Sequence, residues 1–453
     1  MSSIRLIINK ANLRKAAPAI LLVFNSFVWY IITYPIFANA VTGLKLSGAA
    51  NIEIFSSYFV SLAITAIVGS KYLPRVRNKA LCLWPLLGGV ATLCIGALSS
   101  QNVLINTLIA VFLGSSVGIG LPSCLSYFAE STSIETRGFV GGLTWGGVGI
   151  TVVLFAFFLL ALGNWEAFVA LAIWRLAGAV IFSILKRNHE KPQSDQKSPS
   201  YLELIQKREI LLYFVPWTMF SLVNFVEIPI LSKVFGATTF AFVQTAEFGI
   251  AGLFAVIGGI IADIQGRKRV IISGFILLGI EYAALSLFSL GTPGIADSTP
   301  MLYVYLILDG ATWGLLLSMF FTTIWGDLGG NQIKEKYYAL GGLPYLLSNF
   351  LSIIIMPYAD KIPFGLAFTF ASFFLFMAVI PLMYASETLP EKTMKDRDLK
   401  SYAEKALKQA RKENDKKKGN ESDKAEPETE EDKEDDQQPP GYDEARKLAE
   451  KYY

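Results

Sequence analysis

The chain has 453 residues, 53% of them hydrophobic, and its mean hydropathy is +0.45. A soluble protein of this length needs more polar surface than this composition supplies, so a soluble globular fold is excluded. Charged residues concentrate beyond residue 387, and the net charge of +3 therefore averages two unlike regions and says little about partners. The three cysteines lie in apolar runs without paired spacing and the single histidine lies in a polar loop, so we expect no disulfide framework, no metal site and no cofactor.

Twelve stretches are long and apolar enough to cross a bilayer, which takes about 20 residues. We predict membrane helices at 17–40, 52–71, 80–99, 103–128, 138–162, 165–186, 209–231, 239–262, 270–290, 301–325, 337–358 and 363–386. The first run lacks a small-residue cleavage site, so we interpret it as a membrane helix and not as a removed signal peptide. The expected fold is an all-α membrane protein with twelve transmembrane helices, and its first partner is the lipid bilayer.

Lysine and arginine in the short loops set the expected orientation. One side of the predicted membrane holds twenty of these residues and the other side holds three. Since basic residues are retained in cytoplasmic loops, both termini are predicted to be cytoplasmic in a multi-pass protein of the cell membrane. The basic residues are scattered over short loops, so we expect no nucleic-acid partner.

The chain divides near its middle, where the longest loop before the C-terminal region separates six predicted helices from six. The expected parts are an N-terminal six-helix bundle (1–187), a cytoplasmic linker (188–208), a C-terminal six-helix bundle (209–387) and a charged, largely disordered cytoplasmic tail (388–453). A weak internal repeat supports two pseudo-symmetric bundles: Arg77 aligns with Arg267, and GGLTW from Gly141 aligns with GGLPY from Gly341. Chance similarity between apolar helices is the alternative.

The strongest local motif joins the eighth and ninth predicted helices. It reads Gly259-Ile-Ile-Ala-Asp263-Ile-Gln-Gly266-Arg267-Lys268-Arg269. It resembles the G-x-x-x-D-x-x-G-R-K/R-x motif of the major facilitator superfamily. Gly259 permits close helix approach, Gly266 permits a tight turn, and Asp263 can accept hydrogen bonds at a neighbouring helix N-terminus or pair with an arginine. The matching loop of the first half has Leu73 at the Asp position and Val76 at the Gly position, which predicts a reduced gating role for that loop.

A second resemblance lies in the loop between the fourth and fifth helices. Tyr127 and Glu130, followed by Arg137, resemble the Y-x-x-E-x6-R-G pattern of sugar-porter-like members of the superfamily. Loop 10–11 repeats this acid-to-base spacing, and the chain ends its twelfth helix with a sequence close to the family's P-E-T. The resemblance implies a cytoplasmic charge network that closes an inner gate. The implied gate residues are Glu130, Arg137, Gly259, Asp263, Gly266, Arg267, Arg269, Asp327, Lys334 and Glu387. Ordinary charges at the membrane edge are the alternative.

Five charged residues lie within predicted membrane helices, where an unpaired charge costs several kcal/mol. They are Arg175, Glu227, Glu247, Glu281 and Asp309. In the layout that the resemblance implies, the first, fourth, seventh and tenth helices line a central cavity. Asp309 and Glu227 are therefore the leading cavity carboxylates and Glu247 is next. Arg175 and Glu281 fall on peripheral helices, where a structural polar contact and a functional role remain equally open.

The candidate substrate and coupling residues are Asn25, Glu227, Glu247, Asp309 and Trp313. A carboxyl group in a poorly solvated cavity can carry a proton, so protons are the candidate coupling ion. For Asn25 and Trp313, helix packing is the alternative to substrate contact. The first helix lacks the acidic residue usual for proton coupling in symporters, and the seventh lacks a Gln-Gln pair, so a sugar is not favoured over another small organic solute.

The leading functional prediction is a secondary active or facilitative transporter that works by alternating access between two rocking halves. No G-x-x-x-x-G-K-S/T loop for ATP is present, so energy must come from a gradient. The alternative is a sensor of the same fold that signals through its tail, whose partner is unknown. An integral-membrane enzyme is disfavoured because the sequence contains no metal-ligand cluster and its single histidine lies in a polar loop.

Overall fold

A computed structural model describes residues 11–186, 199–291 and 299–390, which are almost entirely helical. Most of the predicted linker and the predicted disordered tail lie outside the described residues. The described residues up to Leu389 form one packed unit.

The N-terminal half consists of α2 to α8. Its helices are α2 Leu13–Gly43, α3 Gly48–Tyr72, α4 Arg77–Cys94, α5 Val103–Gly118, α6 Leu121–Ser131, α7 Arg137–Leu160 and α8 Asn164–Leu185, with short 3-10 turns η1 Leu73–Val76 and η2 Ile95–Ala97. The first residues of α2, α3 and α5 are capped by the side chains of Asn12, Ser47 and Asn102, which accept backbone hydrogen bonds there.

The C-terminal half consists of α9 to α16. Its helices are α9 Tyr201–Gln206, α10 Arg208–Phe235, α11 Ala237–Gln265, α12 Arg267–Gly291, α13 Thr299–Leu317, α14 Ile324–Gly329, α15 Glu335–Ile355 and α16 Phe364–Tyr384. A π-helical segment, η4 Ser318–Thr323, joins α13 to α14, and the 3-10 turn η5 Met356–Lys361 follows α15. π-Helical segments inside α-helices often occur at functional positions.

Each of the twelve predicted membrane helices corresponds to a helical segment. Within the described ranges, eleven segments are long and apolar enough to span a membrane, and one of them, Gly48–Ala97, has 50 residues. A straight helix of that length would extend about 75 Å, over twice the thickness of the hydrocarbon layer. The turn η1 divides it into α3 and α4, which gives twelve crossings and confirms the predicted all-α membrane fold.

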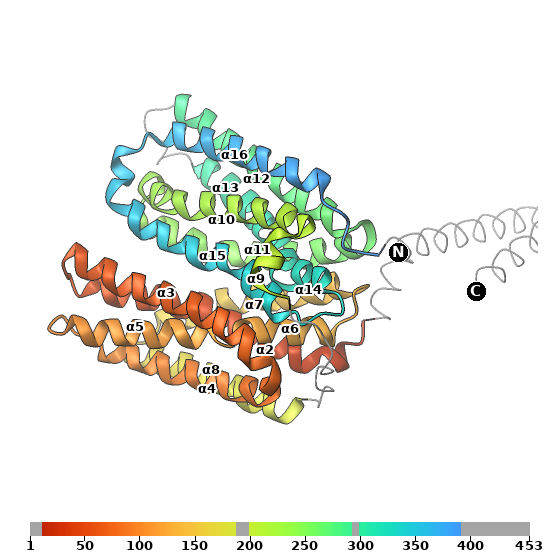
Figure 1. Ribbon diagram of the computed structural model, residues 1–453. Helices are drawn as coiled ribbons and strands as arrows, with labels where there is room; N and C mark the ends of the chain where they lie inside the picture. Colours follow the sequence, from red (N-terminus) through yellow and green to blue (C-terminus); the bar gives the residue numbers. More distant parts are fainter. Residues whose placement is uncertain (1–10, 187–198, 292–298, 391–453) are drawn as a thin grey trace, which may run out of the picture. The chain divides into compact units, whose positions relative to one another are not determined.

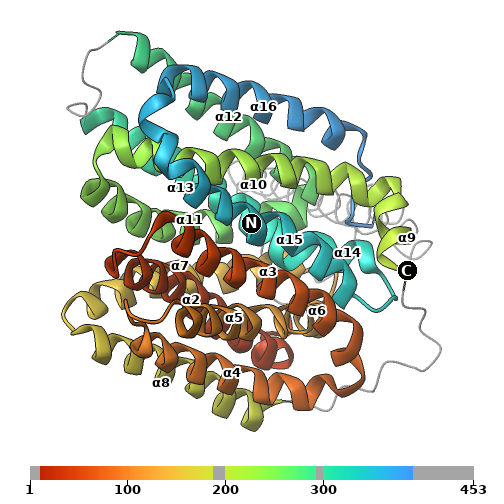
Figure 2. The same ribbon diagram turned by 60° about the vertical axis from the view of Figure 1, so that its left-hand side comes forward.

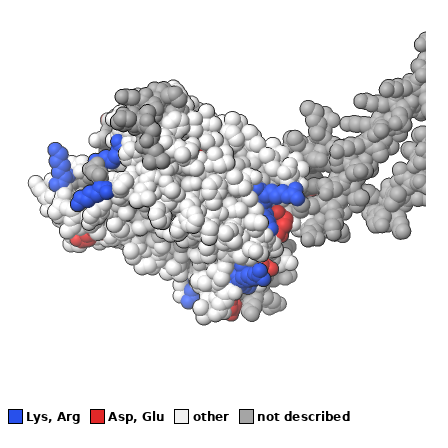
Figure 3. All heavy atoms as spheres, turned by 90° about the horizontal axis from the view of Figure 1, so that it is seen from above, with Lys and Arg blue, Asp and Glu red and all other residues white. Residues whose placement is uncertain are grey.

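The outer surface of the helices is apolar. Leucine, isoleucine and phenylalanine side chains point outward, with Leu160 80% exposed and Ile184 75% exposed. On the face shown in Figure 3, charged side chains gather toward the two ends and an uncharged surface separates them. A lipid environment explains this surface because hydrocarbon tails solvate apolar side chains and exclude charges.

Figures 1 and 2 show α2–α8 on one side and α10–α16 on the other, with α7 beside α11 and α3 beside α15 where the halves meet. Glycines allow the closest of these approaches. A Cβ atom on Gly142 would lie 2.3 Å from the carbonyl oxygen of Ala255, and one on Gly149 would lie 2.1 Å from that of Phe248. The backbones of α7 and α11 therefore touch without intervening side chains.

Candidate functional site

The two halves are joined at the end where Arg77, Arg137 and Arg267 lie, which we call the basic end. Asp263, near the end of α11, accepts hydrogen bonds from the backbone nitrogens of Gly138 (3.0 Å) and Phe139 (2.7 Å), the first turn of α7 in the other half. A carboxylate at a helix N-terminus interacts favourably with the helix dipole. Asp263 thus links the two halves in the way the loop 8–9 motif predicts for its aspartate.

Arg267 lies at the centre of the network and its side chain is fully buried. It pairs with Asp263 (2.9 Å) and with Asp327 of α14 (3.2 Å), and it donates to the carbonyl oxygen of Ile134 in the other half. Asp327 also pairs with Arg137, the first residue of α7. Two arginines from opposite halves therefore share one buried carboxylate.

Glu387, three residues after the end of α16, binds the start of α12. Its carboxylate accepts backbone hydrogen bonds from Arg267 (2.9 Å) and Lys268 (3.1 Å) at the start of α12. Gly266 has a φ of +104°, and a Cβ atom there would lie 2.4 Å from a carboxylate oxygen of Glu387. The turn therefore needs glycine both for its backbone conformation and for room.

The matching loop of the first half, which joins α3 to α4, also contributes ion pairs, although Leu73 and Val76 replace the Asp and Gly of the motif. Arg77, the first residue of α4, pairs with Glu130 of α6 (2.5 Å) and with Glu335 of α15 in the other half (3.0 Å). The side chain of Glu335 is only 1% exposed. Arg77 and Glu335 are not among the gate residues that the sequence motifs imply, although the repeat aligns Arg77 with Arg267.

The network repeats in the two halves. Glu130 and Asp327 each pair with the arginine of their own half, Arg77 and Arg267 respectively. Asp327 also pairs with Arg137 of the opposite half, and Lys334 of the opposite half lies near enough to Glu130 to interact with it. Burial lowers the pKa of Lys334, and the Glu130 carboxylate offsets part of this shift.

Two of the remaining motif residues have different surroundings. A Cβ atom on Gly259 would lie 2.2 Å from the carbonyl oxygen of Gly138, so Gly259 holds α11 against α7. Arg269 is exposed and makes no ion pair with another described residue. The structure therefore brings nine of the ten predicted gate residues to one place and leaves Arg269 at its edge.

An aromatic layer lies between the halves, farther along the helices. Phe321 of η4 is its hub, with ring centroids 5.2 Å from Phe27, 5.7 Å from Trp145, 5.7 Å from Trp217 and 5.2 Å from Tyr345. The π-helical turn shifts the register of the tenth membrane helix at this position.

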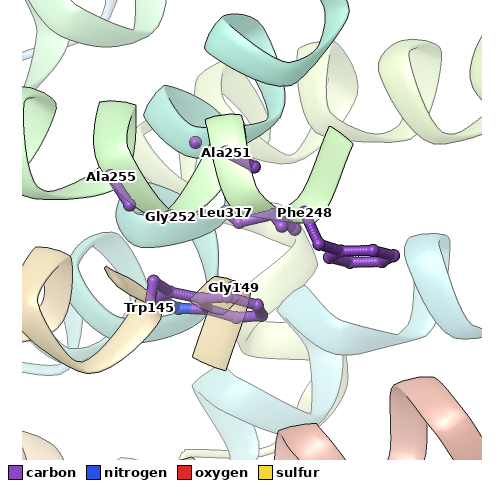
Figure 4. Close-up of a pocket in the computed structure, with 8 residues that line it drawn as sticks. Trp145, Gly149, Phe248, Ala251, Gly252, Ala255 and Leu317 are labelled. Atoms are coloured by element: carbon purple, nitrogen blue, oxygen red, sulfur yellow. The ribbon is translucent and has the colours of Figure 1, made fainter. Parts of the chain in front are cut away.

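Two small cavities adjoin this layer, each of about 10 Å³, which is room for one water molecule. Figure 4 shows one of them, with Trp145 of α7 facing Phe248 and its neighbours on α11. The second is lined by Trp145, Phe248, Phe321 and Tyr345 among others. Both cavities therefore lie at the contact between the halves.

None of the predicted substrate and coupling residues lines either cavity, although one signal in the sequence pointed to residues that do. The aligned repeats GGLTW and GGLPY end in Trp145 and Tyr345, and both side chains line the same cavity. The repeat thus placed equivalent aromatic residues of the two halves opposite each other.

Asn25 lies elsewhere, inside the N-terminal half. Its side chain accepts a hydrogen bond from Arg175 (2.9 Å) and donates to the carbonyl oxygen of Trp174 (2.7 Å). The guanidinium group of Arg175 stacks on the rings of Trp84 and Trp29, 4.3 and 4.8 Å from their centroids. Asn25 is therefore packed with a buried arginine and does not line either cavity.

The remaining candidates lie within the C-terminal half. Trp313 is 9% exposed and packs edge-on against Phe220 and Tyr345, with ring centroids 5.0 and 5.8 Å apart. Asp309 and Glu227 are 1% and 4% exposed. Within the described ranges, no three histidine, cysteine or acidic side chains are placed to hold a metal ion.

The sequence profile of the Major Facilitator Superfamily matches residues 18–328. The chain belongs to this superfamily. No curated protein matches the chain. Among solved structures, the proton:xylose symporter XylE bound to 6-bromo-6-deoxy-D-glucose is similar, with a TM-score of 0.56 and 17% identity over 85% of this chain and 96% of that one. A double-tryptophan mutant of XylE is similar with a TM-score of 0.58 and 17% identity, over 84% of this chain and 97% of that one.

Membership of the superfamily confirms the resemblance that the loop motifs carry. This superfamily member is a multi-pass membrane protein with a transporter fold, and the sensor interpretation receives no support from the comparisons. At 17% identity, the likeness to XylE extends to the fold and does not extend to the substrate.

Proposed function

We propose that the protein carries a small organic solute across the cell membrane by alternating access, with the basic end facing the cytoplasm. The ion-pair network between the halves supports this proposal. Its cross-half contacts are side-chain contacts at helix ends, with no covalent link and no shared helix. Such contacts can break and re-form as the halves rock about a central site.

The gate in this proposal consists of the implied motif residues, extended by Arg77 and Glu335. Breaking a buried ion pair by removing one partner costs about 3–5 kcal/mol, so several pairs together hold the basic end closed. A solute that binds the open form can supply that energy only through its preference for one conformation. The gate therefore makes the protein responsive to its substrate.

The substrate site in this proposal is the aromatic layer between the halves. Its two cavities of about 10 Å³ each are too small for an organic solute while the halves are together. Separation of α7 from α11 would enlarge both cavities and expose Trp145, Phe248 and Tyr345 to a solute. Their rings favour a solute with an apolar or aromatic face. Trp313 supports this site from behind, through its contact with Tyr345.

Transport in this proposal draws on a proton gradient through Asp309, Glu227 or Glu247. A thermal-shift screen of the purified protein against small-solute libraries, followed by counterflow of each stabilising solute in proteoliposomes, tests the function. Exchange of labelled solute across the liposome membrane is the expected result. Binding of a solute without any exchange would show that the protein is a sensor and not a carrier.

A further inference from the structure

Three residues of α13 share one face that points into the C-terminal half. Tyr305, Asp309 and Trp313 follow one another at intervals of four residues, which places them in a row along the helix. All three residues are buried. We call these residues the α13 row. The three helices around it each bring a glutamate to the same level.

The seventh membrane helix, α10, runs antiparallel to α13. Phe220 packs against the last aromatic ring of the α13 row, with centroids 5.0 Å apart, and Phe235 packs against the first, with centroids 5.8 Å apart. Glu227 lies midway between these two phenylalanines, and Asp309 lies midway along the row. The two carboxyl groups are therefore level with each other.

The eighth membrane helix, α11, runs parallel to α13 and touches it closely. A Cβ atom on Gly310 would lie 3.2 Å from the carbonyl oxygen of Glu247. The Glu247 side chain is close enough to Asp309 for the two carboxyl groups to share a hydrogen bond once one of them holds a proton.

The ninth membrane helix, α12, is antiparallel to α13. A Cβ atom on Gly274 would lie 2.9 Å from a side-chain carbon of Leu316. Moving seven residues along each helix from this contact brings Glu281 level with Asp309, because antiparallel helices with equal rise keep their register. The layout implied by the resemblance places Glu281 on a peripheral helix. In the structure its side chain is fully buried inside the C-terminal half, at the level of the other three carboxyl groups.

Three of these carboxyl groups are buried and have oxygens without a hydrogen-bond partner, whereas Glu247 is partly buried. Glu281, Asp309 and Glu227 are 0%, 1% and 4% exposed. Both carboxylate oxygens of Glu281, Oδ1 of Asp309 and Oε2 of Glu227 have no hydrogen-bond partner among the described residues. No ion pair between described residues includes any of them.

A non-acidic residue on α10 also has a buried oxygen without a partner. Asn224 lies one helical turn before Glu227 on α10 and is 4% exposed, and its Oδ1 also has no partner among the described residues. A proton bound to a carboxyl group converts an acceptor into a donor and so satisfies two of these atoms at once. Unpaired negative charges in the membrane are, by contrast, costly.

We propose that Glu227, Glu247, Glu281 and Asp309 form one proton-binding cluster inside the C-terminal half. Protons enter from water, bind to carboxylate oxygens and bridge neighbouring carboxyl groups, and they leave to water when the cluster is exposed to the opposite side. The phenols of Tyr305 and Tyr345 are the other titratable groups near it. The role of the cluster in transport rests on the proposed function, whereas its binding of protons does not.

Infrared spectroscopy of the purified protein tests proton binding without a substrate, because the carbonyl stretch of a protonated carboxyl group is separate from the bands of ionised carboxylates. At neutral pH in sodium-free buffer, wild-type protein is expected to show this band. Glu281→Gln and Asp309→Asn should each reduce its intensity, and replacement of all four residues by their amides should abolish it. Glu166→Gln, an exposed residue on α8, is the matched control and should leave the band unchanged.

Three outcomes would overturn the inference. One is the absence of the band in the wild type, and another is an unchanged band in the fourfold amide variant. The third is a band that disappears when millimolar sodium is added at constant pH, which would identify a sodium site. Solute exchange without the band would retain the proposed transport function and reject the cluster. A normal band in a protein that exchanges no solute would do the reverse.

Discussion

Replacing Asp327 by asparagine should open the basic end of the protein. The Asp327 side chain is fully buried and is shared by Arg137 and Arg267. Arg267 keeps Asp263 at 2.9 Å, whereas Arg137 loses its only carboxylate partner among the described residues. Removing one partner of a buried pair costs about 3–5 kcal/mol, and the lower value applies here because asparagine retains a hydrogen-bonding oxygen. About 3 kcal/mol corresponds to a roughly 100-fold shift toward the open form.

Distance measurement between two spin labels gives the readout. On a cysteine-free background, Ser133→Cys in the N-terminal half and Asn331→Cys in the C-terminal half place exposed labels on the two sides of the basic end. The distance distribution should move to longer values in Asp327→Asn and stay unchanged in Glu166→Gln. If the distribution in Asp327→Asn matched the wild type in a folded protein, the network would be structural packing and not a gate.

Three further changes test other parts of the structure. Gly149→Ala should lower stability to thermal unfolding by about 1–3 kcal/mol because the new methyl group meets α11, whereas Gly43→Ala, with open space around it, should have no effect. Glu387→Ala should cost about 1–2 kcal/mol by removing the cap of α12, and Glu387→Gln should restore most of it; equal losses would contradict a capping role. Tyr345→Ala should weaken binding of a stabilising solute about tenfold in thermal-shift titrations, and unchanged affinity would remove the aromatic layer as its site.

The membrane helices were predictable because their signal is local. Each needs only a run of apolar residues, and twelve such runs match the helices of the structure. The local structure of the motif between the eighth and ninth helices was equally predictable, since glycine, aspartate and arginine at fixed spacing specify a tight turn and a helix cap. The contact of Asp263 with the start of α7 follows from that spacing once the fold is known.

Long-range partners were not predictable from local pattern. Arg77 and Glu335 are 258 positions apart, and each by itself is an ordinary charge at a membrane edge. The same limit applies to Asn25, whose partner Arg175 is 150 positions away. A polar residue in a membrane helix indicates that a polar partner is present. The sequence alone does not show whether that partner is a substrate or a residue of another helix.

The asymmetry of the two loop motifs shows how the network keeps a contact between the halves although one motif is altered. In the second half, Asp263 caps the first turn of α7 across the interface. In the first half, Leu73 replaces that aspartate and cannot accept a hydrogen bond from the start of α15. There, α15 carries its own carboxylate, Glu335, and Arg77 pairs with it across the interface. The cross-half attraction is therefore preserved with acid and base exchanged between the halves, so a degenerate motif in the sequence need not mean a missing contact.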